Sequence, residues 1–477
     1  MDIYKKLSKL GRERKLTKIN IFRRTEFKIF LTVWIVYLFF ISTYAGSYIS
    51  EPTIHQAMSI VDKGSFQVDS YMKDECKLTG CDYSLYNGHY YSGFAPGTSL
   101  FIIPFYLVIK PFNLSIPGSY TISEINTVYL ILLSSILLFS LLSALLSVLI
   151  YSFVLELTNN KKNALIIPFI FAFGTLFFVY SGGFYPRIIS AFLVFLSFYL
   201  LFKYKDKKNN ILFISGFISG LAVTLDFPQI LTMGLLFLYL LSFSRNKKII
   251  YFILGAAIPL IILAAYNYHI YDSPLPSAYE YRARIDPEIS AGEQRIEAAL
   301  PSAEKAFSFL FSLKYGLFIY MPILFMSLFG FWYGIKNKKY SREILLFLFI
   351  FLLQFLFYIS YSVSSPCSFG PRYFLPVLSF LIIPIIFLFD KTVLKVLTLL
   401  LSFVSIFINF LGTSIYYGCV KENILYYFKT FFTKGLSSYT LTLLSNEFFY
   451  ISDITKSLIV IIALGILSTI IYFIWKK

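Results

Sequence analysis

The sequence predicts an all-α, polytopic transmembrane protein of the cell membrane. Of its 477 residues, 57% are hydrophobic and only 14% are charged, whereas soluble domains carry about 25% charged residues. The 54 Phe and 38 Tyr side chains also exclude a disordered chain, because so much aromatic surface cannot stay in water. Apolar stretches run almost end to end. We therefore expect a basic cytoplasmic segment over 1–27 and a single multi-span membrane domain over 28–477.

About twelve stretches are apolar enough to cross the hydrocarbon, which takes about 20 residues of helix. The stretch 97–112 is left out, because Pro104 interrupts it and a crossing there would place the next basic loop outside. We expect it to lie at the outer surface as an interfacial or re-entrant juxtamembrane helix. The predicted spans are 28–49, 122–156, 164–181, 184–203, 211–226, 228–244, 249–268, 312–335, 344–362, 374–389, 396–417 and 457–475.

Charge divides the predicted loops into two sides. The segments expected inside hold 27 Lys and Arg against 7 Asp and Glu, whereas those expected outside hold 15 against 18. Since positively charged loops stay in the cytoplasm, both termini are predicted inside. The net charge of +17 thus reflects topology and a lipid-bilayer partner, with no nucleic acid expected. The long outer segments are about 50–121, 269–311 and 418–456.

All four cysteines fall on the predicted outer side, where disulfides can persist: Cys76 and Cys81 in the first long outer segment, and Cys367 and Cys419 at two other outer edges. Cys76 with Cys81, and Cys367 with Cys419, are candidate disulfides, and four unpaired thiols are the alternative. A zinc site is not expected, because the chain has only three His and no CxxC motif.

Chemistry is expected on the outer face, because the inner loops hold no nucleotide-binding motif and the outer segments carry most of the acids. Candidate catalytic acids are Glu51, directly after the first predicted span, and Asp62 and Asp69 further along. A carboxylate at a helix end near the interface is partly desolvated, which suits it to take a proton from a hydroxyl. The alternative for Glu51 is a solvated helix-end acid. His89 and Tyr91 in the same segment are candidate substrate-binding residues.

Two further candidate substrate-binding charges, Arg187 and Asp226, lie at predicted hairpin tips between spans. A charge within the membrane costs about 2.5–3.5 kcal/mol, so it usually faces a cavity or a partner. Alternatively, both lie just above the hydrocarbon at little cost.

Arginines from three outer segments could meet at one anion. Arg372 and Tyr373 directly precede the predicted span 374–389 on its outer side, and Arg282 lies in the second long outer segment. A guanidinium binds phosphate oxygens with a planar fork, so these residues are candidates for substrate binding together with Arg187. The alternative for each is an interfacial anchor.

Five segments, taken in order, resemble the GT-C superfamily of membrane glycosyltransferases, to which the lipid A aminoarabinose transferases and the protein O-mannosyltransferases belong. Residues 51–64 match the loop in which that family keeps its catalytic acid. Residues 86–104 (YNGHYYSGFAPGTSLFIIP) resemble its Tyr-x-x-Lys-x-Pro segment, which leads into a juxtamembrane helix. Residues 221–228, 265–282 and 369–376 resemble bacterial and archaeal members.

The resemblance implies a glycosyltransferase that moves a sugar from a polyprenyl-phosphate donor to a hydroxyl of a glycan, lipid or protein acceptor, with inversion. It implies Glu51 as the base and Arg187, Arg282 and Arg372 as groups that hold the departing phosphate. This sequence departs from the family pattern at three positions. Glu51 stands where the family usually has Asp, and Phe94 stands where the family has the Lys that contacts the donor phosphate. Arg187 lies near the position of the family's second acidic residue. A divalent cation, Mg²⁺ or Mn²⁺, is left open, although the chain has no Asp-x-Asp motif.

Two other function classes compete with this interpretation. A transporter or flippase of lipid-linked saccharides needs polar residues deep in its spans, where this chain has mostly Leu, Ile, Phe and Ser. A non-catalytic membrane scaffold needs no binding site for a lipid phosphosugar.

Overall fold

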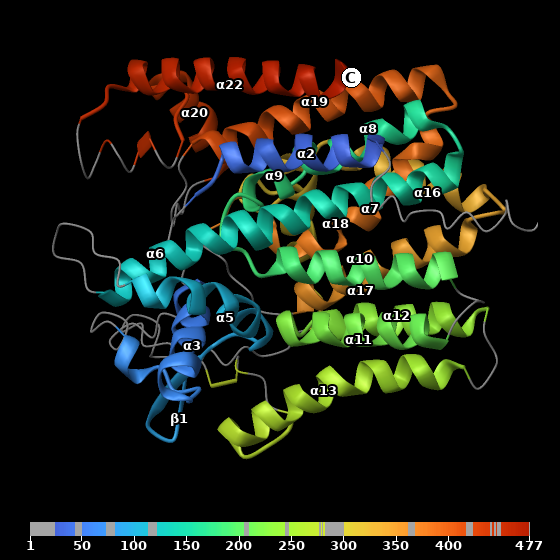
Figure 1. Ribbon diagram of the computed structural model, residues 1–477. Helices are drawn as coiled ribbons and strands as arrows, with labels where there is room; N and C mark the ends of the chain where they lie inside the picture. Colours follow the sequence, from blue (N-terminus) through green and yellow to red (C-terminus); the bar gives the residue numbers. More distant parts are fainter. Residues whose placement is uncertain are drawn as a thin grey trace, which may run out of the picture.

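The computed structural model describes residues 24–42, 50–72, 82–112, 122–204, 209–243, 248–275, 278, 280–281, 300–360, 368–415, 423–438, 441–442, 445 and 450–476. Long helices run side by side, and short elements gather at one end of them (Figure 1). The α-helices are α2 (Arg24–Phe39), α3 (Ser50–Lys63), α5 (Gly97–Ile109), α6 (Ile122–Ser134), α7 (Ser140–Thr158), α8 (Lys161–Gly174), α9 (Phe177–Tyr180), α10 (Arg187–Tyr204), α11 (Asn209–Leu225), α12 (Gln229–Leu241), α13 (Ile249–Tyr271), α14 (Ala303–Phe311), α15 (Leu317–Tyr320), α16 (Leu324–Lys336), α17 (Ser341–Ser360), α18 (Leu378–Ile382), α19 (Thr392–Ser414), α20 (Ile424–Lys434) and α22 (Asp453–Lys476).

Six helices are long and apolar enough to cross a membrane, judged by length and composition within the described residues. This confirms the prediction of a helical protein with several transmembrane candidates, while the number of crossings stays a prediction. The first of the six joins α6 and α7 through a π-helical turn, η3 (Ser135–Phe139). The six are Asn126–Thr158, Arg187–Tyr204, Ile249–Tyr271, Ser341–Ser360, Thr392–Ser414 and Asp453–Lys476.

The other predicted spans correspond to shorter or interrupted helices in the described part of the chain. The stretch 164–181 is divided between α8 and α9, because Thr175 has an extended backbone with ψ of 173°. The stretch 312–335 is interrupted between α15 and α16 at Pro322, which cannot donate a backbone hydrogen bond.

Proline also reshapes the predicted span 374–389. Instead of one α-helix, the chain forms a 3₁₀ turn η4 (Arg372–Val377), then α18, then a second 3₁₀ turn η5 (Ile383–Leu388). Pro376 lies in the first of these turns and Pro384 in the second. Each proline removes one N–H donor, so a regular α-helical ladder cannot run through the segment.

The cluster at one end of the bundle comes from the first long segment predicted outside. It holds α3, α5 and a hairpin of β1 (Tyr83–Tyr86) and β2 (His89–Ser92) (Figure 1). Asn87 and Gly88 turn the hairpin with φ of 47° and 80°, as a type I′ turn requires. The hairpin corrects the expectation of an all-α outer segment. The stretch 97–112 is a short apolar helix packed on α3 and α6, and its interfacial position stays a prediction.

Some helix ends that carry basic residues, and that are predicted to lie on the cytoplasmic side, contact neighbouring helices. Lys28 Nζ at the start of α2 donates to the Trp475 carbonyl at the end of α22, over 3.4 Å. Lys203 Nζ lies 3.1 Å from a carboxylate oxygen of Glu156. The C-terminus lies at the opposite end of the helices from α3 and β1 (Figure 1). The two classes of predicted loop therefore lie at opposite ends of the bundle.

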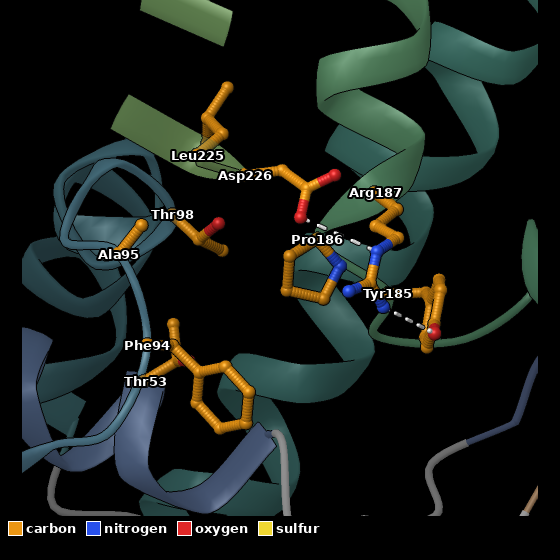
Figure 2. Close-up of a pocket in the computed structure, with 9 residues that line it drawn as sticks. All are labelled: Thr53, Phe94, Ala95, Thr98, Tyr185, Pro186, Arg187, Leu225 and Asp226. Atoms are coloured by element: carbon orange, nitrogen blue, oxygen red, sulfur yellow. Dashed lines mark hydrogen bonds and ion pairs between the residues drawn. The ribbon is translucent and has the colours of Figure 1, made fainter. Parts of the chain in front are cut away.

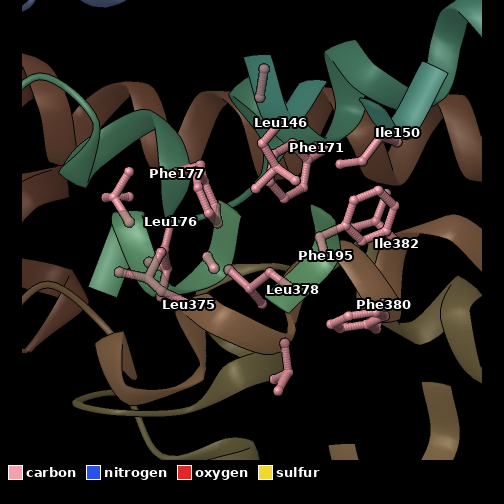
Figure 3. Packing of buried hydrophobic residues seen from close by; sticks show 14 of the residues in the cluster. Leu146, Ile150, Phe171, Leu176, Phe177, Phe195, Leu375, Leu378, Phe380 and Ile382 are labelled. Carbon is pink, nitrogen blue, oxygen red and sulfur yellow. The ribbon is translucent and has the colours of Figure 1, made fainter. Parts of the chain in front are cut away.

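Aromatic side chains fill the core between the helices. Phe195 and Phe198 of α10 contact Phe380 of α18 with ring centroids 5.5 and 6.0 Å apart, and Figure 3 shows this packing around Phe195. Interdigitated rings of this kind fix how α10 lies against its neighbours. The N-terminus of α10, which carries Arg187, is therefore held on a rigid element.

Candidate functional site

Arg187 and Asp226 form a buried ion pair at the cluster end of the bundle. Arg187 is the first residue of α10 and Asp226 directly follows α11. Arg187 Nε lies 3.4 Å from Asp226 Oδ1, and the two side chains are 13% and 3% exposed. Burying such charges is costly unless they are paired, so this ion pair is a specific feature of the site. The two hairpin tips predicted separately are thus brought together.

A pocket with an empty volume of about 350 Å³, which includes its open mouth, lies beside this ion pair. Figure 2 shows segments from four regions of the chain meeting around it. Thr98 in the first turn of α5 is 1% exposed, and its hydroxyl has no hydrogen-bond partner among the described residues. The lining residues are Thr53, Phe94, Ala95, Thr98, Tyr185, Pro186, Arg187, Leu225 and Asp226.

The N-termini of two helices add positive potential to this pocket. α5 begins at Gly97 and α10 at Arg187, so first-turn N–H groups of both helices lie next to the lining residues. A Cβ at Gly97 would lie 2.6 Å from the Thr224 carbonyl oxygen, so only glycine allows α5 to begin this close to α11. The combination of a guanidinium, a hydroxyl and helix N-termini suits an anionic oxygen-rich group.

Tyrosines surround Arg187 and bring Arg372 into the same region. Arg187 Nη1 donates to the Tyr185 hydroxyl over 3.2 Å, and its guanidinium lies 4.8 Å from the centre of the Tyr373 ring. Arg372 lies 5.7 Å from the Tyr185 ring. The predicted residues Arg187, Arg372 and Tyr373 are therefore neighbours.

A polar network continues from Asp226 into the helices. Gln229 Nε2 donates to Asp226 Oδ2 over 2.9 Å, and the Thr232 hydroxyl donates to Gln229 Oε1 over 3.1 Å. Gln354 of α17 donates to the Thr232 hydroxyl over 3.1 Å. These hydrogen bonds fix the Asp226 carboxylate, and through it they orient Arg187.

Glu51 lies in the first turn of α3, the helix that also carries the pocket residue Thr53. Its charge acts on Tyr83, whose pKa is raised first by burial and second by Glu51. The Tyr83 hydroxyl lies 2.7 Å from Nδ1 of His55. His55 follows Glu51 by one helical turn on α3. Sequence reasoning missed His55 and Tyr83. The four-residue spacing of Glu51 and His55 could have indicated the first of them.

Asp62 is held by three partners at the other end of α3. Lys110 Nζ lies 2.7 Å from Oδ1, and the hydroxyls of Tyr71 and Tyr106 donate to Oδ2 over 2.7 and 2.8 Å. Burial alone would raise the pKa of Asp62, but the hydrogen bonds and the Lys110 charge outweigh it and lower the pKa. A carboxylate stabilised in this way is a weak base, so its observed role is to fasten α3 to α5.

This arrangement predicts an acid-sensitive contact between α3 and α5. Because the folded pKa of Asp62 is lowered, its stabilisation is complete above the unfolded pKa of about 3.9 and is lost as the pH falls through the folded pKa. The pair with Lys110 is largely solvated, so we expect at most about 1 kcal/mol. Thermal unfolding should be followed at about pH 6 and about pH 3. We expect acid to lower the unfolding midpoint less in Asp62→Asn than in the wild type. An equal fall in both would contradict this role.

Asp69 fastens the hairpin and does not line the pocket. Its Oδ1 accepts the backbone N–H of Tyr90 over 2.9 Å, and Oδ2 lies 3.1 Å from Nδ1 of His89. Tyr91 belongs to a separate aromatic cluster, with its ring centre 6.2 Å from that of Tyr271. Asp69, His89 and Tyr91 are thus placed around the hairpin, whereas the Arg187 pocket is built from other elements.

Several predicted residues lie outside the described residues, namely Arg282 and the four cysteines Cys76, Cys81, Cys367 and Cys419. Within the described ranges, no group of three or more His, Cys, Asp and Glu side chains could hold a metal ion.

Comparison of the chain with protein-family models, with curated proteins and with solved structures finds no match.

Proposed function

We propose that this protein is a membrane glycosyltransferase that moves a sugar from a polyprenyl-phosphate donor to an acceptor hydroxyl at the outer face of the cell membrane. One observation carries the proposal. Four of the five segments that resemble the GT-C enzymes meet at the Arg187 pocket: Thr53, Phe94 and Asp226 line it, and Tyr373 covers Arg187. The fifth segment reaches α3 through Tyr266, whose hydroxyl accepts from Gln56 over 2.6 Å.

The pocket suits the phosphate of the donor. Two guanidinium groups, those of Arg187 and Arg372, lie close to each other beside this pocket, and guanidinium groups bind phosphate oxygens and stabilise their negative charge. A phosphodiester between a polyprenol and a sugar carries one such charge. Phe94 occupies the position of the family lysine, and Arg187 lies in the same pocket and supplies a cation from another segment. The planar guanidinium group can also donate two parallel hydrogen bonds to a phosphate, which fixes the orientation of the phosphate oxygens.

Glu51 is the proposed base of the transfer. The carboxylate takes the proton of the acceptor hydroxyl while the acceptor oxygen forms its bond to the anomeric carbon. On the opposite face, the bond from that carbon to the phosphate oxygen breaks, and the polyprenyl phosphate leaves with the electron pair. Arg187 and Arg372 stabilise the departing charge. A single displacement of this kind inverts the anomeric carbon.

The proposed location rests on a topology of twelve crossings with both termini in the cytoplasm. We expect a cysteine placed at Ser70 in a cysteine-free variant to react with a membrane-impermeant maleimide in intact cells. A cysteine placed at Lys338 should react only after permeabilisation, and both positions are exposed, so access depends on the side of the membrane. The reverse labelling pattern would overturn the outer-face assignment and the function built on it.

The rival function with structural support is transport of a lipid-linked saccharide. The buried side chains of Gln229, Thr232 and Gln354 extend the polar site toward the interior of the helices, as a translocation path would require. A flippase would move the saccharide across liposomes without forming a new glycosidic bond. Saccharide flux without a product would therefore favour transport over transfer.

The deciding experiment is a transfer assay in proteoliposomes with a panel of polyprenyl-phosphate sugars and membrane acceptors. Mass spectrometry of the products should show one sugar mass added to an acceptor and free polyprenyl phosphate in equal amount. If no product forms and no donor in the panel binds, a non-catalytic scaffold would be favoured.

A further inference from the structure

Thr98 brings a buried hydroxyl to the wall of the Arg187 pocket. The residue is 1% exposed, and its hydroxyl oxygen is buried with no hydrogen-bond partner in the part of the chain that the structure describes. A hydroxyl that leaves water and gains no partner in exchange destabilises the fold. A residue that served packing alone would need no hydroxyl here, because valine has the same shape. The hydroxyl therefore points to a ligand that supplies the missing partner.

The helix that carries Thr98 begins at the same pocket without a side-chain cap. α5 starts at Gly97, and its N-cap residue Pro96 makes no side-chain hydrogen bond to the first turn. The first N–H groups of a helix have no partner within the helix, and they attract anionic oxygens. Ala95 and Thr98 both line the pocket, so the start of α5 forms one of its walls. The buried hydroxyl and the uncapped helix start are two separate features that point to one oxygen-rich anion.

Arg187 lies on the other side of this pocket. In Figure 2 the side chains of Thr98 and Arg187 lie on opposite sides, and Asp226 lies beside Arg187. Phe94 lines the same pocket and brings no charge. A phosphate ester placed between the two walls receives charge-assisted hydrogen bonds from the guanidinium on one side. On the other side it receives hydrogen bonds from the hydroxyl and the helix N–H groups.

We propose that Thr98 and the N-terminus of α5 form an oxygen-binding subsite for a lipid phosphate. The Thr98 hydroxyl and the first-turn N–H groups donate to phosphate oxygens, while Arg187 holds the same phosphate from the opposite wall. The choice of a polyprenyl phosphate as the ligand rests on the proposed function. Thr98 orients the phosphate and exchanges no proton with it.

Ser99 is the matched control, because it is the next hydroxyl-bearing residue in the same helical turn. It is also fully buried, but its hydroxyl lies 2.7 Å from Gln56 Oε1 and 2.9 Å from the Thr53 carbonyl oxygen. This hydroxyl fastens α5 to α3, and Ser99 does not belong to the pocket lining. Removing it should lower the stability of the protein, whereas removing the unpartnered hydroxyl of Thr98 should not.

The test compares Thr98→Val, Thr98→Ser and Ser99→Ala with the wild type in one detergent. Thermal unfolding gives the midpoint of each protein alone, and native mass spectrometry with added polyprenyl phosphate gives its affinity. We expect Thr98→Val to keep or raise the midpoint and to bind polyprenyl phosphate about 10- to 100-fold more weakly, because a hydrogen bond to a charged group is lost. Thr98→Ser should restore most of the affinity. Ser99→Ala should lower the midpoint and leave the affinity close to that of the wild type.

Three results would overturn the subsite. The first is wild-type affinity in Thr98→Val. The second is a midpoint of Thr98→Val that falls as far as that of Ser99→Ala, since the hydroxyl would then serve the fold. The third is a wild-type protein that binds no polyprenyl phosphate and no inorganic phosphate. A parallel titration with inorganic phosphate separates the two sources of the ligand: equal affinity for both, with the same dependence on Thr98, would keep the subsite and overturn the lipid as its ligand.

The subsite and the proposed function fail in different ways. If the wild type binds polyprenyl phosphate through Thr98 but transfers no sugar, the proposed function fails and the subsite stands. If the wild type transfers sugar but Thr98→Val binds polyprenyl phosphate as tightly as the wild type does, the subsite is overturned. The proposed function then stays in place, with the phosphate held by other groups.

Discussion

Replacing Glu51 by glutamine is expected to lower the rate of sugar transfer by about 10²–10⁴-fold, the usual contribution of a general base. The carboxamide has nearly the same shape but cannot accept the acceptor proton at neutral pH. Glu51 is half-buried in the first turn of α3, and glutamine keeps the size of the side chain and one hydrogen-bond acceptor oxygen there. The fold should therefore survive, and the loss should appear in kcat with the donor affinity retained.

Asp272→Asn is the matched control for this experiment. It makes the same change from carboxylate to carboxamide on an exposed acid at the cluster end of the bundle. Asp272 ends α13 in a left-handed conformation with φ of 55°, which asparagine also tolerates, and its Oδ2 accepts from the Tyr86 hydroxyl over 3.2 Å. Transfer in Asp272→Asn should stay within about threefold of wild type, since surface changes usually cost less than about 0.5 kcal/mol. Wild-type activity in Glu51→Gln would remove Glu51 from the mechanism.

Much of the architecture follows from hydropathy and charge, because both act over whole segments. Six of the expected spans are single long helices, and the basic loops meet at one end. The interruptions were harder to foresee because each depends on a local feature. Pro322, Pro376 and Pro384 were visible signals, whereas the extended backbone at Thr175 has no comparable marker in the sequence.

The site was predictable in its charges but not in its contacts. Arg187 and Asp226 stood out because charges at hairpin tips are rare in so apolar a chain, yet the sequence does not show that they pair. Asn87-Gly88 is a strong local signal for a hairpin, and the expectation of an all-α segment overlooked it. Tyr83 could not be singled out, because it is one of 38 tyrosines and its role depends on a hydrogen bond to another segment.

Replacing Asp226 by alanine is expected to destabilise the protein by about 3–5 kcal/mol, because it leaves the Arg187 guanidinium buried without its carboxylate. Arg372 nearby adds a second positive charge to the same region, which makes the uncompensated state worse. The change also releases Gln229 from its acceptor on Asp226. Thermal unfolding in a fixed detergent should show a large fall in the midpoint. A fall equivalent to less than about 1 kcal/mol would mean that the pair is effectively solvated.

The double variant Arg187→Leu/Asp226→Leu separates the structural role of the ion pair from its role in binding. Removing both charges together avoids an unpaired buried ion, and apolar replacements of buried pairs are often neutral or stabilising. We therefore expect the thermal midpoint to return most of the way to that of the wild type. Transfer should nevertheless be lost, because the guanidinium that would hold the donor phosphate is gone. A stable double variant with wild-type turnover and donor affinity would show that the ion pair serves the fold alone, and the phosphate would have to bind elsewhere.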